Sequence, residues 1–328
     1  MTTSSLHRNT SLAICIAVLL SLVTSTVSAQ TFPSRTIRIV DAFSPGGTSD
    51  YLARIIGAKL SESIGQPVVV DNKVGGGGVI GANAVATAAP DGYTLLLGAN
   101  TVLAAGPSLR ELPYDLLRDL TPVTGVVTGA YVLIASTASE AKSVEDLVAR
   151  AKAKPGQLNF GSAGIGSGTH LVCELFKRRT MVDVVHVPHR AGTALVSAVI
   201  AGQVDFACIT TSAALGQIKG GKLRALAATS PERLPLLPDV PTVAESGYPD
   251  FEAAASFGLY APGGTPKEIV TVLNREVRKV LAMPDVRDRL TALAVVPNGT
   301  RPEELGASLT AEMKRWAEVI KAAGIRAE

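Results

Sequence analysis

The stretch "TIRIVDAFSPGGTSDYLARIIGAKL" (Thr36–Leu60) indicates the fold class. A strand-like apolar run ends in Ser-Pro-Gly-Gly, and a helical pattern begins immediately afterwards. The first backbone N–H groups of a helix have no partner within the helix, so such a junction aims free donors at a negative group. No Gly-Lys-Ser/Thr follows the glycines, which argues against the phosphate loop of nucleotide hydrolases. Three interpretations of the junction remain: a site for a catalytic oxyanion, a site for a carboxylate ligand, or a capped turn without any ligand.

The alternation of strand and helix signals continues along the chain. Most candidate strands are continuous apolar runs, which is typical of strands buried on both faces of a sheet. We expect strands at 36–43, 68–71, 94–98, 132–136, 159–162, 183–187, 206–210, 223–228 and 257–261. We expect helices at 50–64, 80–89, 144–154, 170–179, 193–201 and 213–219, and a mainly helical C-terminal tail. This order predicts an α/β protein with two lobes, mainly parallel sheets flanked by helices, and a ligand between the lobes at the carboxyl ends of strands.

The composition argues against nucleic acid and against a membrane anchor. With a formal net charge of +3 and no Lys/Arg block, the sequence shows no basic patch of the kind that binds nucleic acid. The apolar run "SLAICIAVLLSLV" (Ser11–Val23) is too short to span a bilayer and is followed by small residues. We therefore expect residues 1–29 to be a signal peptide that is cleaved after about Ala29, and no stable membrane insertion of the mature chain.

Two cysteines remain after such cleavage, Cys173 and Cys208. In the oxidising compartment that export implies, an even pair can form a disulfide. The alternative is that both are small buried hydrophobic residues, one in the helical run "LVCELF" and one in the strand-like run "VDFACIT". The sequence leaves both possibilities open.

A second glycine-rich segment, "NKVGGGGVIGANAVA", resembles a dinucleotide-binding fingerprint. Gly76, Gly78 and Gly81 match the pattern GxGxxG between a strand and a helix. Four consecutive glycines satisfy that pattern easily, however, and no acid follows about twenty residues later at the end of a second strand. The segment favours a flexible strand-to-helix turn, and we expect no cofactor.

The third glycine-rich segment is "FGSAGIGSGTHLVCELF" (Phe160–Phe176). Ser167 and His170 leave an exported serine hydrolase as an alternative, although neither nearby serine stands in the Gly-x-Ser-x-Gly pattern of a nucleophile elbow. His170 and Glu174 share a helix face, but no third ligand is evident, so we expect no metal site.

The first and third junctions have the same arrangement, a strand, a glycine-rich turn and then a helix, and one lies in each half of the chain. Two helix N-termini that face one another across a cleft would hold one small anion. Hydrogen bonds to a charged group contribute about 1.5–3 kcal/mol each, and helix ends add about 0.3–2 kcal/mol. A few such bonds suffice for micromolar affinity without an arginine or lysine. The sequence therefore predicts a carboxylate ligand.

Several collinear segments resemble one family of receptors. They include "PGGTSDYLAR", "GQPVVVDNKVGGGGVIGANAVATAAPDGYTLLLG", "LPYDLLRDLTPV", "FGSAGIGSGTHLVCELF", "HVPHRAG", "AGQVDFA" and "LPDVPTVAESG". With these motifs the chain resembles the substrate-binding proteins of tripartite tricarboxylate transporters, the Bug-type periplasmic receptors, over nearly its whole mature length. The resemblance implies a two-lobed Venus-flytrap protein of the type II periplasmic-binding class, without catalysis, which delivers a carboxylate to membrane permease subunits. We expect lobe 1 to comprise 30–128 plus 252–328 and lobe 2 to comprise 129–251.

The resemblance also implies the binding residues. They come from two cleft loops, from the end of a strand and from the "GQVD" segment: Phe43, Gly46, Gly47, Thr48, Ser49, Asp50, Asn100, Ser162, Ala163, Gly164, Gly166, Ser167, Thr169, His170 and Asp205. The chain departs from the usual family pattern at a few places, which leave the carboxylate grip intact but alter the walls of the distal pocket: Asp41, Ala42, Ser44, His189, Arg190 and Ser256.

Overall fold

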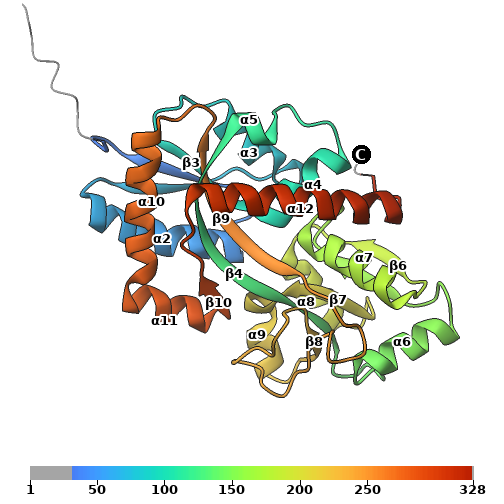
Figure 1. Ribbon diagram of the computed structural model, residues 1–328. Helices are drawn as coiled ribbons and strands as arrows, with labels where there is room; N and C mark the ends of the chain where they lie inside the picture. The colour runs from blue at the N-terminus through green and yellow to red at the C-terminus, as the bar shows by residue number, and fades with distance from the viewer. Residues whose placement is uncertain (1–31, 327–328) are drawn as a thin grey trace, which may run out of the picture. The chain divides into compact units, whose positions relative to one another are not determined.

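The computed structural model describes residues 32–326 of the chain (Figure 1). From Arg35 onward the chain forms one compact unit. The expected signal peptide lies outside the described residues. Within the described part, no helix combines the length and the apolar character needed to cross a membrane.

The strands follow the order β2-β1-β3-β9-β4-β7-β5-β6, with β8 and β10 added onto β4. Their bounds are β1 Ile37–Asp41, β2 Val68–Asn72, β3 Thr94–Ala99, β4 Leu120–Ser136, β5 Asn159–Ser162, β6 Val185–Pro188, β7 Phe206–Thr210, β8 Leu223–Ala228, β9 Ala254–Pro262 and β10 Val295–Pro297. The helices are α2 Thr48–Ile64, the short 3-10 turn η1 Gly76–Gly78, α3 Val79–Ala86, α4 Asn100–Leu109, α5 Leu116–Asp119, α6 Val144–Ala153, α7 Gly168–Thr180, α8 Gly192–Ile200, α9 Thr211–Lys219, α10 Lys267–Ala282, α11 Pro284–Ala292 and α12 Pro302–Ala323.

Each lobe contains a small parallel core. In lobe 1, β1 pairs in parallel with both β2 and β3, and in lobe 2, β5 pairs in parallel with both β6 and β7. Because parallel strands end at the same edge, the turns that follow β1 and β3 gather at one edge of the first core. The turns that follow β5, β6 and β7 gather at one edge of the second core.

One long strand joins the two cores. β4 is 17 residues long; its first part pairs antiparallel with β9 and β10, and its second part pairs antiparallel with β7 and β8. In Figure 1, β4 and β9 run side by side from one group of helices to the other. The sheet is therefore mixed rather than mainly parallel, because the strands that link the lobes run against the parallel cores.

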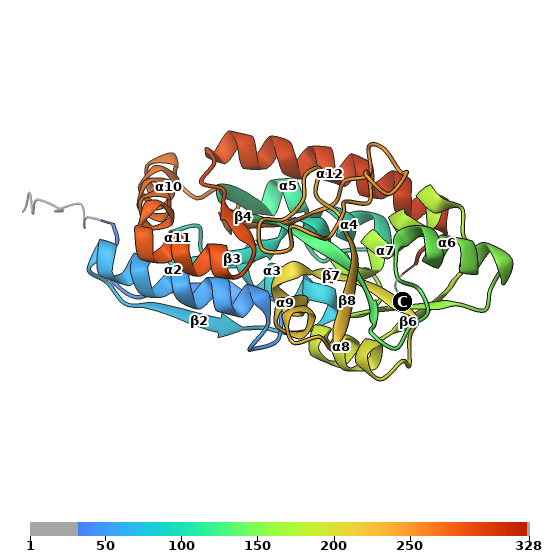
Figure 2. The ribbon, with the colours of Figure 1, turned by 90° about the horizontal axis from the view of Figure 1, so that it is seen from below.

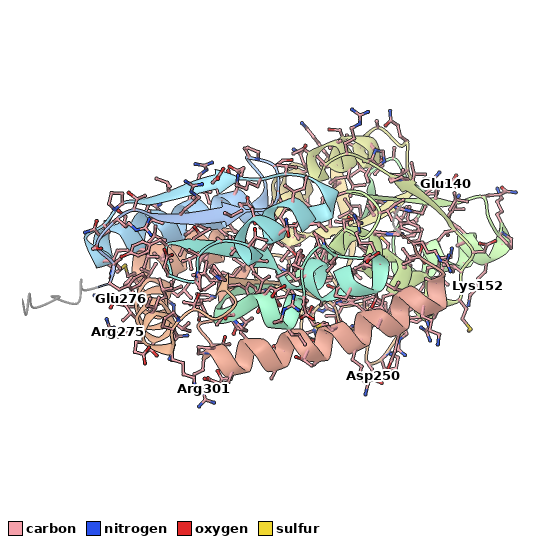
Figure 3. The ribbon with its side chains drawn as sticks, turned by 90° about the horizontal axis from the view of Figure 1, so that it is seen from above. Glu140, Lys152, Asp250, Arg275, Glu276 and Arg301 are labelled. Carbon is pink, nitrogen blue, oxygen red and sulfur yellow. The ribbon has the colours of Figure 1, made fainter. Side chains whose placement is uncertain are left out.

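The helix α12 also reaches both lobes. It begins after Arg301, packs against α4 and β4, and then contacts α7; in Figure 3 it extends from the labelled Arg301 past Asp250. Its Trp316 is among the largest fully buried side chains, with Phe160 and Phe176 of lobe 2 in the same apolar cluster. The core thus continues beneath α12 from one lobe to the other.

The two cysteines lie within this core as free thiols. Cys173 of α7 and Cys208 of β7 are both buried, and the backbone N–H of Cys208 donates to Cys173 Sγ at 2.9 Å. Of the two possibilities that the sequence leaves open, the structure favours small buried residues over a disulfide.

Candidate functional site

The turn between β1 and α2, residues 43–47, is here called the first loop. It leads into a helix whose N-cap residue, Gly47, has no side chain that could cap the free N–H groups of the first turn. Gly46 adopts a φ of +79°, a conformation that favours glycine. Because α2 follows β1 through this short loop, the backbone donors at its start lie beyond the carboxyl end of β1.

A second uncapped helix N-terminus meets the first from lobe 2. The Thr48 Oγ1 and Ser212 Oγ atoms lie 2.9 Å apart, so a hydrogen bond joins the first turns of α2 and α9. The N-cap of α9, Thr210, makes no side-chain capping bond. The hydroxyl of the next residue, Thr211, donates to Ala130 O. Figure 2 shows α2 extending toward α9.

Ser212 was not among the expected site residues, since the junction "FACITTSAAL" between strand and helix contains no glycine. The sequence pattern that could have indicated this junction is a strand followed at once by small polar residues and a helical pattern.

The turn between β5 and α7, residues 163–167, is here called the second loop, and most of its backbone donors have partners on the residues that flank it. Ala163 N donates to Thr169 Oγ1 at 2.8 Å, and Gly164 N donates to Ser162 Oγ at 3.1 Å. Gly166 N donates to His170 Nδ1 at 3.1 Å. The sequence predicts that these N–H groups grip the ligand, whereas the structure uses them to hold the loop itself.

Ser167 caps α7 and does not act on a histidine ring. Its Oγ accepts the backbone N–H of His170 at 3.3 Å and donates to Gly164 O at 2.7 Å. The ring nitrogen Nδ1 of His170 is already the acceptor for Gly166 N. The nucleophile–base contact that a serine hydrolase needs is therefore absent between Ser167 and His170.

Two histidines stack behind the second loop. The rings of His170 and His186 are 3.9 Å apart at 11°, and Phe160 stacks on His186 at 4.9 Å. Burial, together with the neighbouring ring, lowers the pKa of His170 to about 3; burial and the nearby His189 lower the pKa of His186 to about 4. Both rings are therefore neutral at neutral pH, and the Nε2 atom of His186 lies 2.6 Å from Ser162 Oγ.

His170 and Glu174, which share a face of α7, lie close together. His170 Nε2 and Glu174 Oε1 are 3.8 Å apart, and among the described residues no group of three His, Cys, Asp or Glu side chains could hold an ion.

A pocket at the carboxyl ends of β1 and β3 brings all three glycine-rich segments together. Its lining includes Phe43 of the first loop, Gly76–Gly78, and Gly166 of the second loop. Its volume of about 20 Å³ corresponds to roughly one water molecule. Arg110, which the sequence analysis missed, also lines it and donates from Nη1 to Gly76 O at 3.0 Å. A Cβ at Gly81 would lie 2.7 Å from the Cβ of Ala42, so a glycine at this position lets α3 pack closely against the residue that follows β1.

Two further expected residues lie in different surroundings. Asn100 begins α4 directly after β3, but its Oδ1 accepts the hydroxyl of Tyr260 at 2.8 Å and the residue is buried. Asp205 accepts the N–H of Asn159 at 2.7 Å, which places it at the amino end of β5. The structure therefore does not bring Asp205 to the edge where Ser162 and the second loop lie.

Two carboxyl groups lie directly behind the first loop. Asp50 accepts the N–H of Gly46 at 3.0 Å and forms an ion pair with Arg54 at 2.8 Å, and the bond to Arg54 is the largest cause of its lowered pKa. Asp41 accepts the hydroxyl of Ser49 at 2.6 Å and the N–H of Phe43 at 3.2 Å. Burial raises the pKa of Asp41 to about 6, although these hydrogen bonds oppose the rise.

Comparison with known proteins assigns the family. A profile described as "Tripartite tricarboxylate transporter family receptor" matches residues 52–325. The structure of the periplasmic binding protein BugD aligns with a TM-score of 0.82 at 33% identity, over 90% of this chain and 100% of BugD.

Two solved structures from Rhodopseudomonas palustris are also similar, and each carries a bound acid. Rpa4515 with adipate aligns with a TM-score of 0.85 at 36% identity, over 90% of this chain and 99% of that chain. MatC (Rpa3494) with malate aligns with a TM-score of 0.82 at 36% identity, over 88% of this chain and 100% of that chain. These matches confirm the two-lobed periplasmic-binding fold and the Bug-type resemblance that the sequence motifs indicate, and the chain belongs to the family of tripartite tricarboxylate transporter receptors.

Proposed function

We propose that this protein captures a small organic carboxylate between its two lobes, in the periplasm, and delivers it to the membrane subunits of a tripartite tricarboxylate transporter. The observation that carries the proposal is the meeting of two uncapped helix N-termini, α2 and α9, which the Thr48–Ser212 hydrogen bond joins across the lobes. The family match and the acids bound to Rpa4515 and MatC support it.

The chemistry of this meeting point suits an anion. Free N–H groups at a helix start are hydrogen-bond donors, and the helix dipole adds a partial positive charge to each N-terminus. Hydrogen bonds to a carboxylate contribute about 1.5–3 kcal/mol each. The sum over several donors, less the cost of fixing the ligand in place, gives micromolar affinity. We assign the grip to α2 and α9, and the wall of the site to Phe43, the second loop and Arg110.

The lobes are proposed to divide as 30–128 plus 252–328 and 129–251. β4 and β9 link them, so a rotation about these strands would open and close the site. A receptor role without a catalytic step is part of the proposal, and the family match supports it. Export by cleavage after about Ala29 belongs to the same proposal.

A thermal-shift screen tests the function directly. The panel contains adipate, malate, other di- and tricarboxylates, aromatic acids and amino acids, each with its neutral amide as a control. An acid present at about 100 times its dissociation constant adds about 2.7 kcal/mol, which raises the midpoint by several degrees. A shift with acids alone supports the proposal. Equal shifts with the amides, or no shift with any acid after the protein has been unfolded, dialysed and refolded, contradict it.

A further inference from the structure

A fully buried carboxyl group is connected to the donors at the start of α2. Asp41, the last residue of β1, has 0% of its surface exposed. One of its oxygens accepts the Ser49 hydroxyl at 2.6 Å and the Phe43 N–H at 3.2 Å, and the other accepts Asn72 Nδ2 at 3.1 Å. Ser49 lies in the first turn of α2 and Phe43 lies in the first loop. The Ser49 side chain thus connects Asp41 to the place where the carboxylate is proposed to bind.

The charges around Asp41 do not balance. From α2 it faces the Asp50 carboxylate and the Arg54 guanidinium, which are paired with each other at 2.8 Å. From β2 it faces the neutral amide of Asn72, which also donates to Asp50 at 3.0 Å. From β3 its paired neighbour is the apolar Leu97, and the buried face of α3 carries small apolar residues. The Arg54 guanidinium is thus paired with Asp50, and among the described residues no cation forms an ion pair with Asp41.

A bound carboxylate would add a third negative charge to this group. If it accepts the N–H groups of the first turn of α2, only the Ser49 side chain separates it from Asp41. Repulsion between like charges a few ångströms apart, in a region with little solvent, favours the neutral form of the group that is already the easiest to protonate. Burial already raises the pKa of Asp41 to about 6, so that a small further rise would protonate it near neutral pH.

We propose that Asp41 is a proton-binding site linked to the ligand site, so that the receptor takes up a carboxylate together with a proton from solvent. This inference rests on the proposed function. The ligand keeps its charge, the proton goes to a carboxyl oxygen of Asp41, and the Ser49 and Asn72 contacts hold that side chain in place. Asp41 is then a positioning residue that sets the charge accepted at α2, and it disfavours a doubly charged head group such as a phosphate monoester.

Calorimetry measures this linkage directly. Adipate is titrated into the protein at about pH 6.5 in PIPES and in imidazole, two buffers with different ionisation enthalpies, and the difference in heat gives the number of protons taken up. We expect uptake of about half a proton or more, and an affinity that falls about tenfold from about pH 6 to about pH 8.5. If adipate does not bind, the acid with the largest shift in the thermal screen replaces it.

Three variants identify the group that takes up the proton. Asp41→Asn should abolish the uptake and make the affinity independent of pH. Ser49→Ala removes a bond that favours the ionised form of Asp41, so it should keep the uptake but move the midpoint of the affinity profile to higher pH. Asp71→Asn is the matched control, because this partly exposed acid of β2 pairs with Arg38 and Lys73. It should leave both quantities unchanged.

Several outcomes overturn the proposal. Binding without proton uptake and with a flat pH profile removes the linkage but leaves the receptor function intact. Uptake that persists in Asp41→Asn assigns the proton to another group. If Asp41→Asn does not fold, an unchanged profile in Ser49→Ala counts against Asp41 in the same way. If no acid of the panel binds, the proposed function fails first and the linkage falls with it.

Discussion

At the scale of single residues, the site depends on which donors are already engaged. The sequence presents the starts of α2 and α7 as equivalent, since each follows a strand and small residues. In the structure Ser167 caps α7, whereas Gly47 leaves α2 without a side-chain cap. Sequence reasoning could predict both junctions, but the competing partners of the second loop, such as the His170 ring for Gly166 N, arise only from three-dimensional packing.

Gly46 is the residue of the first loop whose backbone conformation most requires a glycine. Its φ of +79° costs a side chain about 1–2 kcal/mol, although no atom would crowd a Cβ there. We expect Gly46→Val to lower acid affinity at least about tenfold and to lower the unfolding midpoint of the free protein by only a few degrees. Thermal shifts with and without adipate measure both effects. Gly216→Ala in α9, where a Cβ also meets nothing, is the control; retained binding in Gly46→Val contradicts the prediction.

The stacked histidines give the fold a defined dependence on pH. An unfolded chain protonates histidine near pH 6.5, whereas the folded protein keeps His170 neutral to about 3 and His186 neutral to about 4. The unfolded state therefore binds more protons below about pH 6.5, and the free energy of unfolding falls as the pH falls toward 3. Asp41 acts in the opposite direction between about pH 6 and 4, since its folded pKa is raised.

We expect the histidines to dominate this balance. At pH 5 a fully buried neutral histidine costs about 2 kcal/mol, and the half-buried His186 costs less. Urea unfolding at pH 7 and pH 5 should show a net loss of stability in the wild type and a smaller loss in His170→Asn. A wild type that becomes more stable at pH 5 would be incompatible with this assignment.

At the scale of the elements, the continuous apolar strands are the best predicted part of the fold. The strands at 159–162, 206–210 and 223–228 have the expected bounds. The first part of β4, "LTPVTGVVTGAY", was not predicted, because its Pro, Gly and Thr residues resemble a loop. Its pairing with β9 includes two irregularities. The helix α4 was missed for a similar reason, since it contains Gly106 and Pro107. Antiparallel pairing and helix packing stabilise both segments despite their local composition.

The start of α7 offers a matched pair of glycines for a test of packing. Gly168 and Gly192 are each the first residue of a helix, but a Cβ at 168 would overlap the hydroxyl of Tyr131 of β4, whereas a Cβ at 192 meets nothing within 4 Å. We expect Gly168→Ala to lower the free energy of unfolding by about 1–3 kcal/mol. Gly192→Ala should change it by less than about 0.5 kcal/mol. Denaturant midpoints measure both, and similar values for the two variants would refute the assignment.

At the scale of the whole molecule, β4, β9 and α12 connect the lobes, while Thr48 and Ser212 are where the lobes meet at the site. The resemblance of the chain to a known family predicted the two-lobed arrangement, because many collinear motifs were present. It could not predict that α9 would face α2, since the angle between two lobes depends on long-range packing rather than on local sequence.

The hydroxyl pair between the lobes can be tested by a double-mutant cycle. We expect Thr48→Val and Ser212→Ala each to weaken acid binding, and the double variant to be weaker by less than the sum, with a coupling of about 0.5–1.5 kcal/mol. Calorimetric affinities of the four proteins give this coupling. Strict additivity would mean that the two hydroxyl groups do not act together in the ligand-bound protein.

The placement of Trp316 has an optical consequence. The chain contains one tryptophan, and it lies buried on α12, the helix that contacts both α4 and α7. Its fluorescence therefore comes from a single place, where parts of the two lobes approach one another beneath that helix. A change of emission after rapid mixing with an acid would report lobe movement in real time and without any attached dye.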